Sequence, residues 1–117
     1  MPVRELDLSI QESLENIQML GIKSGCFCDS ELYWRGEELV ALYDYFEAVI
    51  ENGISTIKAI FVNLFVTEEK LEFRLMVENP GELPELRWKS SQIMIQSEEE
   101  SVSIRICFFR EGDRLWV

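Results

Sequence analysis

Two short polar stretches contain the residues best suited to chemistry. They are Glu-Asn-Gly at residues 51–53 and Glu-Asn-Pro-Gly at residues 78–81. Carboxylates can accept protons or hydrogen bonds, and amide oxygens are suitable ligands for hard cations. Both stretches also have an ordinary structural interpretation, because Asn-Gly is typical of a helix end and Asn-Pro and Pro-Gly form turns. The residue types leave both interpretations open.

The sequence has no histidine and three cysteines. The absence of histidine excludes Ser-His and Cys-His catalysis, and also a phosphoacceptor histidine within this segment. A single residue separates Cys26 from Cys28, whereas paired zinc ligands usually have two or more residues between them, so structural cysteines are favoured. An odd number of cysteines without a secretory signal predicts reduced thiols in a cytosolic compartment.

Composition predicts one soluble domain over residues 1–117, since 47% of the residues are hydrophobic and can fill a single core. The net charge of −11 would repel nucleic acid and anionic membrane surfaces. A nucleotide would need a local cation, a metal or a helix N-terminus to offset this charge. The most apolar run, residues 57–66, is interrupted by Asn63 and is too short to insert into a membrane.

Two helices must position the first polar stretch. Apolar residues at intervals of three and four predict a helix over residues 5–20, with Gly21 as its stop. A short strand is expected over residues 22–29, followed by a long helix over residues 37–54. The apolar face of the long helix comprises Leu39, Leu42, Tyr43, Phe46, Val49, Ile50 and Gly53.

Four strands in two hairpins follow, over residues 57–67, 71–78, 92–96 and 102–109. The acidic run at residues 98–100 is interpreted as a solvated hairpin loop. We therefore expect an α+β two-layer sandwich, with a mixed, mostly antiparallel sheet of four to five strands and helices on one face. The aromatic residues that could stack on a base, contact a partner or border the core are Tyr33, Trp34, Trp88 and Trp116.

Residues 46–54, Phe-Glu-Ala-Val-Ile-Glu-Asn-Gly-Ile, resemble the N-box helix of the histidine-kinase-like ATPases (GHKL, Bergerat fold). The resemblance is strongest to bacterial sensor kinases, whose N-box ends in Glu-Asn-Ala. In this family a hairpin follows, and its second strand ends in Asp-x-Gly-x-Gly. Val-Glu-Asn-Pro-Gly at residues 77–81 occupies that place. The order of elements agrees over about residues 6–109.

The resemblance implies roles for individual residues. Asn52 matches the asparagine that coordinates magnesium, and Glu51 matches the acidic residue before it, a candidate general base. Glu78 takes the place of the aspartate that accepts a hydrogen bond from the adenine amino group. Asn79 and Gly81 complete the cofactor-binding turn. In a helix Glu51 and Asn52 lie about 100° apart, so they cannot both point squarely into one pocket.

The sequence departs from the family at the phosphate-binding glycines. Residues 82–91 contain no glycine, Pro80 replaces a family glycine, and residues 54–56 lack the family's basic or histidine residue. One hypothesis is thus a degenerate module with weak or absent nucleotide binding, which contacts other domains of a cytoplasmic signalling protein or a second copy of itself. The alternative is a functional ATP/Mg-binding domain of a two-component sensor kinase. An open, adenine-sized pocket would favour the alternative, whereas Trp88 or residues 80–84 filling it would favour degeneracy.

Overall fold

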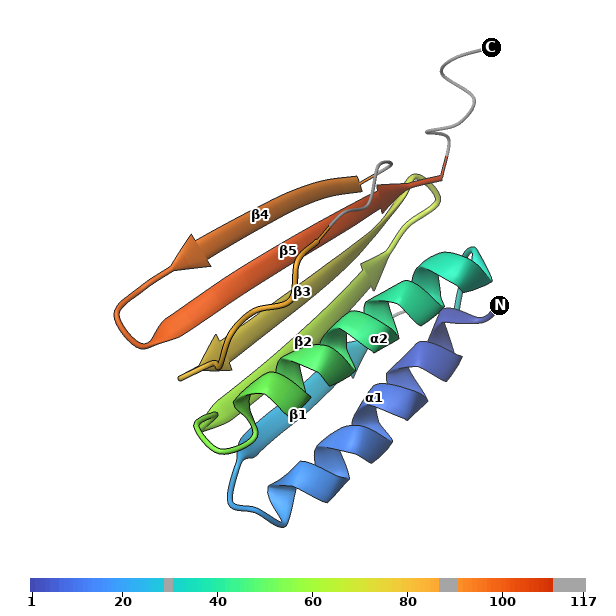
Figure 1. The fold of residues 1–117 in the computed structure, drawn as a ribbon. Helices are drawn as coiled ribbons and strands as arrows, with labels where there is room; N and C mark the ends of the chain where they lie inside the picture. Colours follow the sequence, from blue (N-terminus) through green and yellow to red (C-terminus); the bar gives the residue numbers. More distant parts are fainter. Residues whose placement is uncertain (29–30, 87–90, 111–117) are drawn as a thin grey trace.

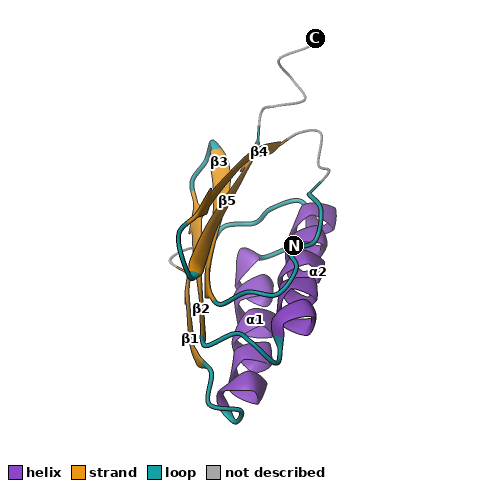
Figure 2. Cartoon of the chain, turned by 60° about the vertical axis from the view of Figure 1, so that its left-hand side comes forward, coloured by secondary structure: helices purple, strands orange, loops and turns teal. Residues whose placement is uncertain are grey.

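The computed structural model describes residues 1–28, 31–86 and 91–110. Within them, helices α1 (Val3–Gln18) and α2 (Gly36–Gly53) cover one face of a sheet (Figure 1, Figure 2). The strands are β1 (Lys23–Cys28), β2 (Ala59–Val66), β3 (Lys70–Glu78), β4 (Ser91–Ser97) and β5 (Ser101–Phe109). Their order is β1-β2-β3-β5-β4, with β1 and β2 parallel and all other neighbours antiparallel. The predicted fold class is confirmed.

Helix α1 packs its apolar stripe on the sheet and α2. The stripe consists of Val3, Leu6, Ile10, Leu14 and Ile17, all buried. The chain leaves the helix as predicted at Gly21, whose φ of 85° lies in the left-handed region that favours glycine. The amide of Gly21 donates to the Gln18 carbonyl at 3.0 Å, which satisfies one of the free carbonyls of the last turn.

Helix α2 also packs the predicted face against the core, with one buried residue added. Tyr45 is buried, whereas Tyr43 is only half-buried and has its hydroxyl 3.0 Å from Ser13 Oγ on α1. Tyr43 lies on the predicted apolar face, partly buried against the core, and Tyr45 is a buried residue that the predicted face did not include. A tyrosine at the border of a helix pair can bury its ring and keep its polar tip near water, and the position of α1 decides which tyrosine does so.

The central strands supply most of the core. The inward-facing side chains of β3 and β5 are at most 3% exposed, and they are Leu71, Phe73, Leu75, Val77, Val102, Ile104, Ile106 and Phe108. Full burial of one such side chain contributes about 1.5–3 kcal/mol. Both predicted hairpins are confirmed by the β2–β3 and β4–β5 pairings.

Cys26, Cys28 and Cys107 are thiols that do not form disulfides with one another. Among the described residues there is no group of three or more Cys, Asp or Glu side chains that could hold a metal ion. In the same part of the chain, neither helix has the length and apolar character needed to cross a bilayer. The predicted turn at residues 110–114 and the segment 115–117 lie mostly or wholly outside the described residues, as do Trp88 and Trp116.

Candidate functional site

The C-terminal end of α2 brings the first polar stretch to the surface. Glu51 and Asn52 are both exposed, whereas Gly53 is buried. The carbonyl of Gly53 accepts hydrogen bonds from the amides of Thr56 at 2.9 Å and Ile57 at 2.8 Å. These bonds end the helix and lead the chain directly into β2. Asn-Gly here therefore forms the end of a helix, whichever further role Asn52 has.

The second polar stretch lies directly against this helix end. A Cβ placed on Gly81 would lie 2.6 Å from the Asn52 carbonyl carbon and 2.9 Å from Gly53 Cα. A Cβ placed on Gly53 would in turn meet the Gly81 amide nitrogen at 2.8 Å. Only two glycines allow backbones to approach this closely. We call the contact of Asn52, Gly53, Gly81 and Glu82 the junction.

The Asn52 side chain closes the junction. Its Nδ2 donates to the Glu82 carbonyl at 2.9 Å. Beyond this point Leu83 and Leu86 pack on the edge of the hydrophobic core. In Figure 1 the chain after β3 crosses the helix-covered side of the sheet. Residues 81–86 thus pack against the end of α2 and the core.

Glu78 faces away from the junction. Side chains alternate along β3, and its inward positions are the buried ones such as Val77, so Glu78 belongs to the face without helices. Glu78 is exposed there, beside a shallow hollow of about 330 Å³ that Phe61, Met76 and Glu100 also line. The carboxylate that would read adenine and the amide that would hold magnesium therefore lie on opposite sides of the sheet.

Asn79 makes the turn that separates the two faces. Its φ of 55° is in the left-handed region, which asparagine tolerates better than most residues. Its amide donates to the Glu100 carbonyl at 2.6 Å and so ties the turn to the β4–β5 loop. A hollow of about 540 Å³ beside this turn is lined by Gly81 and by Glu98, Glu99 and Glu100. These carboxylates would repel a phosphate group.

As arranged, the predicted site residues do not converge on one space. The structure brings Asn52 next to Gly81, leaves Glu51 in solvent and turns Glu78 to the other face. These positions do not fit a site that holds magnesium and adenine together. The roles of Glu51, Asn52, Glu78, Asn79 and Gly81 in nucleotide binding stay predictions.

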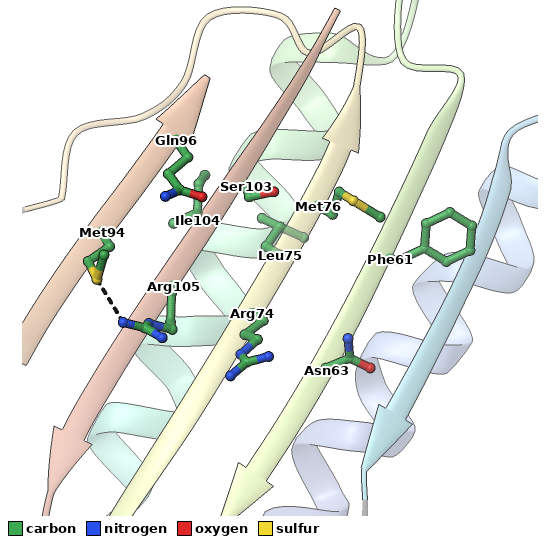
Figure 3. Close-up of a pocket in the computed structure, with 10 residues that line it drawn as sticks. All are labelled: Phe61, Asn63, Arg74, Leu75, Met76, Met94, Gln96, Ser103, Ile104 and Arg105. Carbon is green, nitrogen blue, oxygen red and sulfur yellow. Dashed lines mark hydrogen bonds between the residues drawn. The ribbon is translucent and has the colours of Figure 1, made fainter. Parts of the chain in front are cut away.

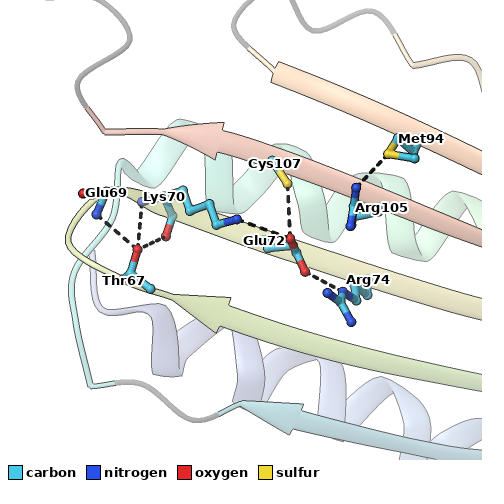
Figure 4. Close-up of polar contacts among 8 residues, drawn as sticks. All are labelled: Thr67, Glu69, Lys70, Glu72, Arg74, Met94, Arg105 and Cys107. Carbon is cyan, nitrogen blue, oxygen red and sulfur yellow. Dashed lines mark hydrogen bonds and ion pairs between the residues drawn. The ribbon is translucent and has the colours of Figure 1, made fainter.

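Sequence reasoning missed a buried polar cluster on the outer face, which we define as the sheet face away from the helices. Glu72 is only 6% exposed there, 2.5 Å from Arg74 Nε and 3.8 Å from Lys70 Nζ (Figure 4). The Cys107 thiol donates to Glu72 Oε1, the oxygen that also faces Lys70, at 3.5 Å. Strand alternation places Glu72 on the face opposite the core, and the signal available for its ion pairs was a glutamate flanked at i±2 by two cations on a strand.

Burial and charge act oppositely on this cluster. Desolvation alone would raise the pKa of Glu72, but the hydrogen bond and charge of Arg74, with smaller effects of Cys107 and Lys70, hold the pKa below its usual value. Burial and the nearby Glu72 carboxylate raise the pKa of the Cys107 thiol. The thiol therefore stays protonated and acts as a donor rather than as a nucleophile.

A groove of about 360 Å³ crosses the outer face (Figure 3). Phe61, Met76 and Met94 line it, together with Arg74 and Arg105, which are direct cross-strand partners. Arg105 Nη2 lies 2.7 Å from Met94 Sδ, a weak acceptor. The charge of Arg74 is balanced by Glu72, so Arg105 is the arginine that adds positive charge to this groove.

Of the aromatic candidates that the structure describes, one is core and one is surface. Trp34 is 3% exposed, with its Nε1 donating to Glu38 at 2.7 Å and Arg110 stacked 4.3 Å from its ring centre. Arg35 lies on the ring too, at 5.1 Å. Tyr33 is 64% exposed. Trp34 therefore holds the loop before α2 against the end of β5 and is closed to a base.

Comparison with known proteins gives similarity in fold alone. No protein-family model matches the sequence, nor does any curated protein. The structure is similar to the Acinetobacter baumannii histidine kinase AdeS, with a TM-score of 0.64 and 10% identity over 93% of this chain. The match covers 65% of the AdeS chain in that structure, slightly less than two thirds of its length.

Two further kinases share the fold. A nucleotide-free catalytic domain of histidine kinase ThkA matches with a TM-score of 0.57 and 11% identity, over 92% of this chain and 91% of that domain. The cytoplasmic segment of histidine kinase QseC matches with a TM-score of 0.55 and 11% identity, over 92% and 75%. ThkA in complex with the response regulator TrrA also matches, with a TM-score of 0.56 and 14% identity, over 96% and 40%. The chain thus has the fold of histidine kinase catalytic domains.

Proposed function

We propose that this chain is a degenerate histidine-kinase-type ATPase domain, which acts as an interaction module in a two-component signalling protein and binds Mg-ATP weakly or not at all. It works in the cytoplasm, attached to or beside other domains of a sensor kinase. The QseC match is a cytoplasmic segment, and the ThkA match includes a complex with a response regulator. Such domains and regulators are the partner class we propose.

The junction is the observation that carries this proposal. Gly81 touches the backbone of Asn52 and Gly53, and the Asn52 amide is used to hold Glu82. A ligand entering beside Asn52 would have to displace residues 81–86, whose leucines pack on the core. Fully burying a leucine is worth about 1.5–3 kcal/mol, and Leu83 and Leu86 are partly buried, so displacing them would cost part of that amount for each and lower the net binding energy of a nucleotide.

The electrostatics support the same proposal. Glu78 and Glu98–Glu100 surround the turn that would approach the nucleotide, and the chain as a whole carries a charge of −11. Among the described residues, no cation lines either hollow beside this turn. A triphosphate would meet repulsion from fixed carboxylates before any contact with an amide or a metal.

A second candidate function is a working ATP/Mg-binding domain. The observation in its favour is the shared fold with the ThkA catalytic domain, which covers nearly the whole of that domain. In this case residues 81–86 would move aside, Asn52 would hold the metal and Glu51 would act as the general base.

Isothermal titration calorimetry separates the two candidates. We expect no magnesium-dependent heat when ATP or ADP is titrated to millimolar concentration, with the ThkA catalytic domain as a positive control. Saturable heat that needs magnesium and is lost in Asn52→Ala would overturn the degenerate assignment. Saturable heat that persists in Asn52→Ala would place binding elsewhere and remove Asn52 from both proposals.

A further inference from the structure

Strand β4 is an edge strand without the usual protection against pairing. In the described part of the chain its neighbour in the sheet is β5 alone. Its sequence, Ser-Gln-Ile-Met-Ile-Gln-Ser, contains no charge, proline or glycine. The opposite edge, β1, carries Lys23 and Gly25 and has α1 packed on it. Sheet edges normally carry charges, prolines or bulges that block the addition of another strand, so β4 is the edge open to one.

The sequence of β4 reads identically in both directions from Met94. If two copies pair antiparallel about a twofold axis at Met94, Ser91 faces Ser97, Gln92 faces Gln96 and Ile93 faces Ile95. The two Met94 side chains face each other. A twofold interface requires a surface that complements itself, and in β4 every opposed pair is a pair of like residues.

The backbone is in the correct phase for this pairing. The Arg110 amide donates to the Glu69 carbonyl, and the Glu98 amide donates to the Ser101 carbonyl. Opposed residues in an antiparallel ladder alternate between backbone-hydrogen-bonded and non-bonded pairs. Glu98 and Ser101 are a bonded pair, so Met94 and Arg105, four positions along the ladder, are joined by backbone hydrogen bonds as well. Ile93 and Ile95 then direct their backbone groups to the open edge.

With the axis at Met94, the Ile93 of each copy forms a bonded pair with the Ile95 of the other. Met94 falls at a non-bonded pair, where side chains are closest. The pairing therefore leaves the β5 ladder intact and uses only backbone groups that point outward.

Side-chain exposure supports the same register. Met94 is 48% exposed on the outer face, and Ile95 is 51% exposed on the other face. The pairing would cover both. It would also place Gln92 against Gln96 on the outer face, where two amides can hydrogen-bond.

Charge selects the antiparallel arrangement. Each copy has the carboxylates of Glu98–Glu100 immediately after β4. Parallel pairing would set the two acidic loops side by side. In antiparallel pairing they lie at opposite ends of the strand pair, roughly 20 Å apart for seven residues, which is beyond the screening length of about 8 Å at physiological salt.

We propose that the chain forms a twofold dimer in which two β4 strands pair antiparallel about Met94 and join the two sheets into one of ten strands. The occupant of the open edge is a second copy of this chain. Among the described strands, the dimer leaves the two β1 edges, each of which carries Lys23, a residue type that disfavours edge pairing. This pairing does not depend on the proposed function, since a nucleotide-binding domain could dimerise through β4 equally well.

Sedimentation velocity from 1 to 500 µM tests the pairing. The wild-type chain is expected to shift from monomer to dimer within this range. Ile95→Pro removes an outward N–H without taking a bond from β5, and Ile95→Lys adds a charge to the edge, so each should weaken the dimer at least about ten-fold. Leu8→Lys is the matched control, because Leu8 is 53% exposed on α1 and makes the same change of charge. It should dimerise like the wild type.

Disulfide trapping tests the register. Cα atoms of a non-bonded pair are about 4.5 Å apart, within disulfide range, so Met94→Cys should form a covalent dimer under mild oxidation. Ile95→Cys places its two thiols on diagonal positions with Cα atoms about 7–8 Å apart and should oxidise no faster than the wild type with its three native thiols. A wild type that stays monomeric to 500 µM overturns the proposal, and so does a dimer that Met94→Cys does not trap or that Ile95→Cys traps equally. If the natural partner of β4 is a strand of another protein, the wild-type chain would stay monomeric to 500 µM.

Discussion

The junction and the outer face differ in what they do with their polar residues. At the junction, the residues that resemble a nucleotide motif are used to join a helix end to a turn, with Gly81 touching Asn52 and Gly53. On the outer face, away from Glu78, an open groove is lined by Arg105 and three exposed apolar side chains. One region is closed by its own backbone, and the other presents side chains to solvent.

This difference shows that a sequence motif at a position does not by itself make that position a binding site. Asn-Gly and Asn-Pro-Gly occur at helix ends and in turns as readily as in ligand sites. The fold does not require a groove with arginines and exposed methionines. Single exposed apolar residues are ordinary, whereas a group of them marks a contact surface. We therefore expect mutations at the junction to change stability and mutations at the sheet edge to change association.

The largest expected effect is that of Gly81→Ala. The added methyl group would collide with the Asn52 carbonyl, and the neighbouring atoms are backbone that cannot rotate away. Overpacking of this kind costs about 3 kcal/mol or more in free energy of unfolding. Urea denaturation followed by circular dichroism measures it.

The control for this variant is Gly25→Ala in β1. A Cβ there would have Phe61 as its nearest neighbour at 3.5 Å, an ordinary contact with a ring that can shift. Its free energy of unfolding should change by less than about 1 kcal/mol. Equal effects of the two alanines would show that the junction is not a close backbone contact, and the contrast between the two regions would be lost.

A smaller effect is expected for Glu72→Gln on the outer face. The variant loses the ion pair with Arg74 and the charge near Lys70, while Gln keeps the shape. Because Arg74 is about half exposed, solvent screens the pair, and the expected loss near pH 7 is about 1–2 kcal/mol. The free energy of unfolding at that pH measures it.

The pH dependence of the same variant gives an independent check. The pKa of Glu72 is lowered in the folded chain, so its contribution is complete above the unfolded value of about 4.3 and disappears as the pH falls through the folded value. The difference between wild type and Glu72→Gln should thus be constant from pH 7 to pH 5 and shrink below about pH 4. Glu69→Gln in the exposed turn is the control, and a gap that already shrinks between pH 7 and pH 5 would rule out the ionised cluster.

The sequence was sufficient for the fold because most of its signals were local. Alternation in residues 71–78 and the three- and four-residue spacing in residues 5–20 each identify one buried face, and both faces are buried in the structure. The stop at Gly21 followed from the same local chemistry. The burial of Tyr45, which the predicted face did not include, depends on where neighbouring elements pack, which no local pattern contains.

The site was less predictable because it depends on contacts between distant segments. Whether Asn52 faces a ligand or Glu82 is decided by the path of the chain 30 residues later. Strand alternation over residues 71–78 predicts Glu78 on the face opposite Val77, and the structure agrees. Gly81 could be recognised as a turn glycine, but not as the glycine on which α2 rests.

Asn52→Ala is the smallest change and the one that distinguishes the two regions most sharply. It removes a solvent-exposed hydrogen bond of 2.9 Å to Glu82, so the free energy of unfolding should fall by about 0.5–1 kcal/mol. Glu51→Ala, next to it and also exposed, should stay within about 0.5 kcal/mol of the wild type. If Asn52 were kept for ligand binding, its replacement by alanine would raise the free energy of unfolding, since binding sites are commonly maintained at a cost to stability. If Asn52→Ala stabilises the chain, the Asn52–Glu82 contact is not a structural one, and the magnesium-binding role that the sequence suggests for Asn52 is favoured instead.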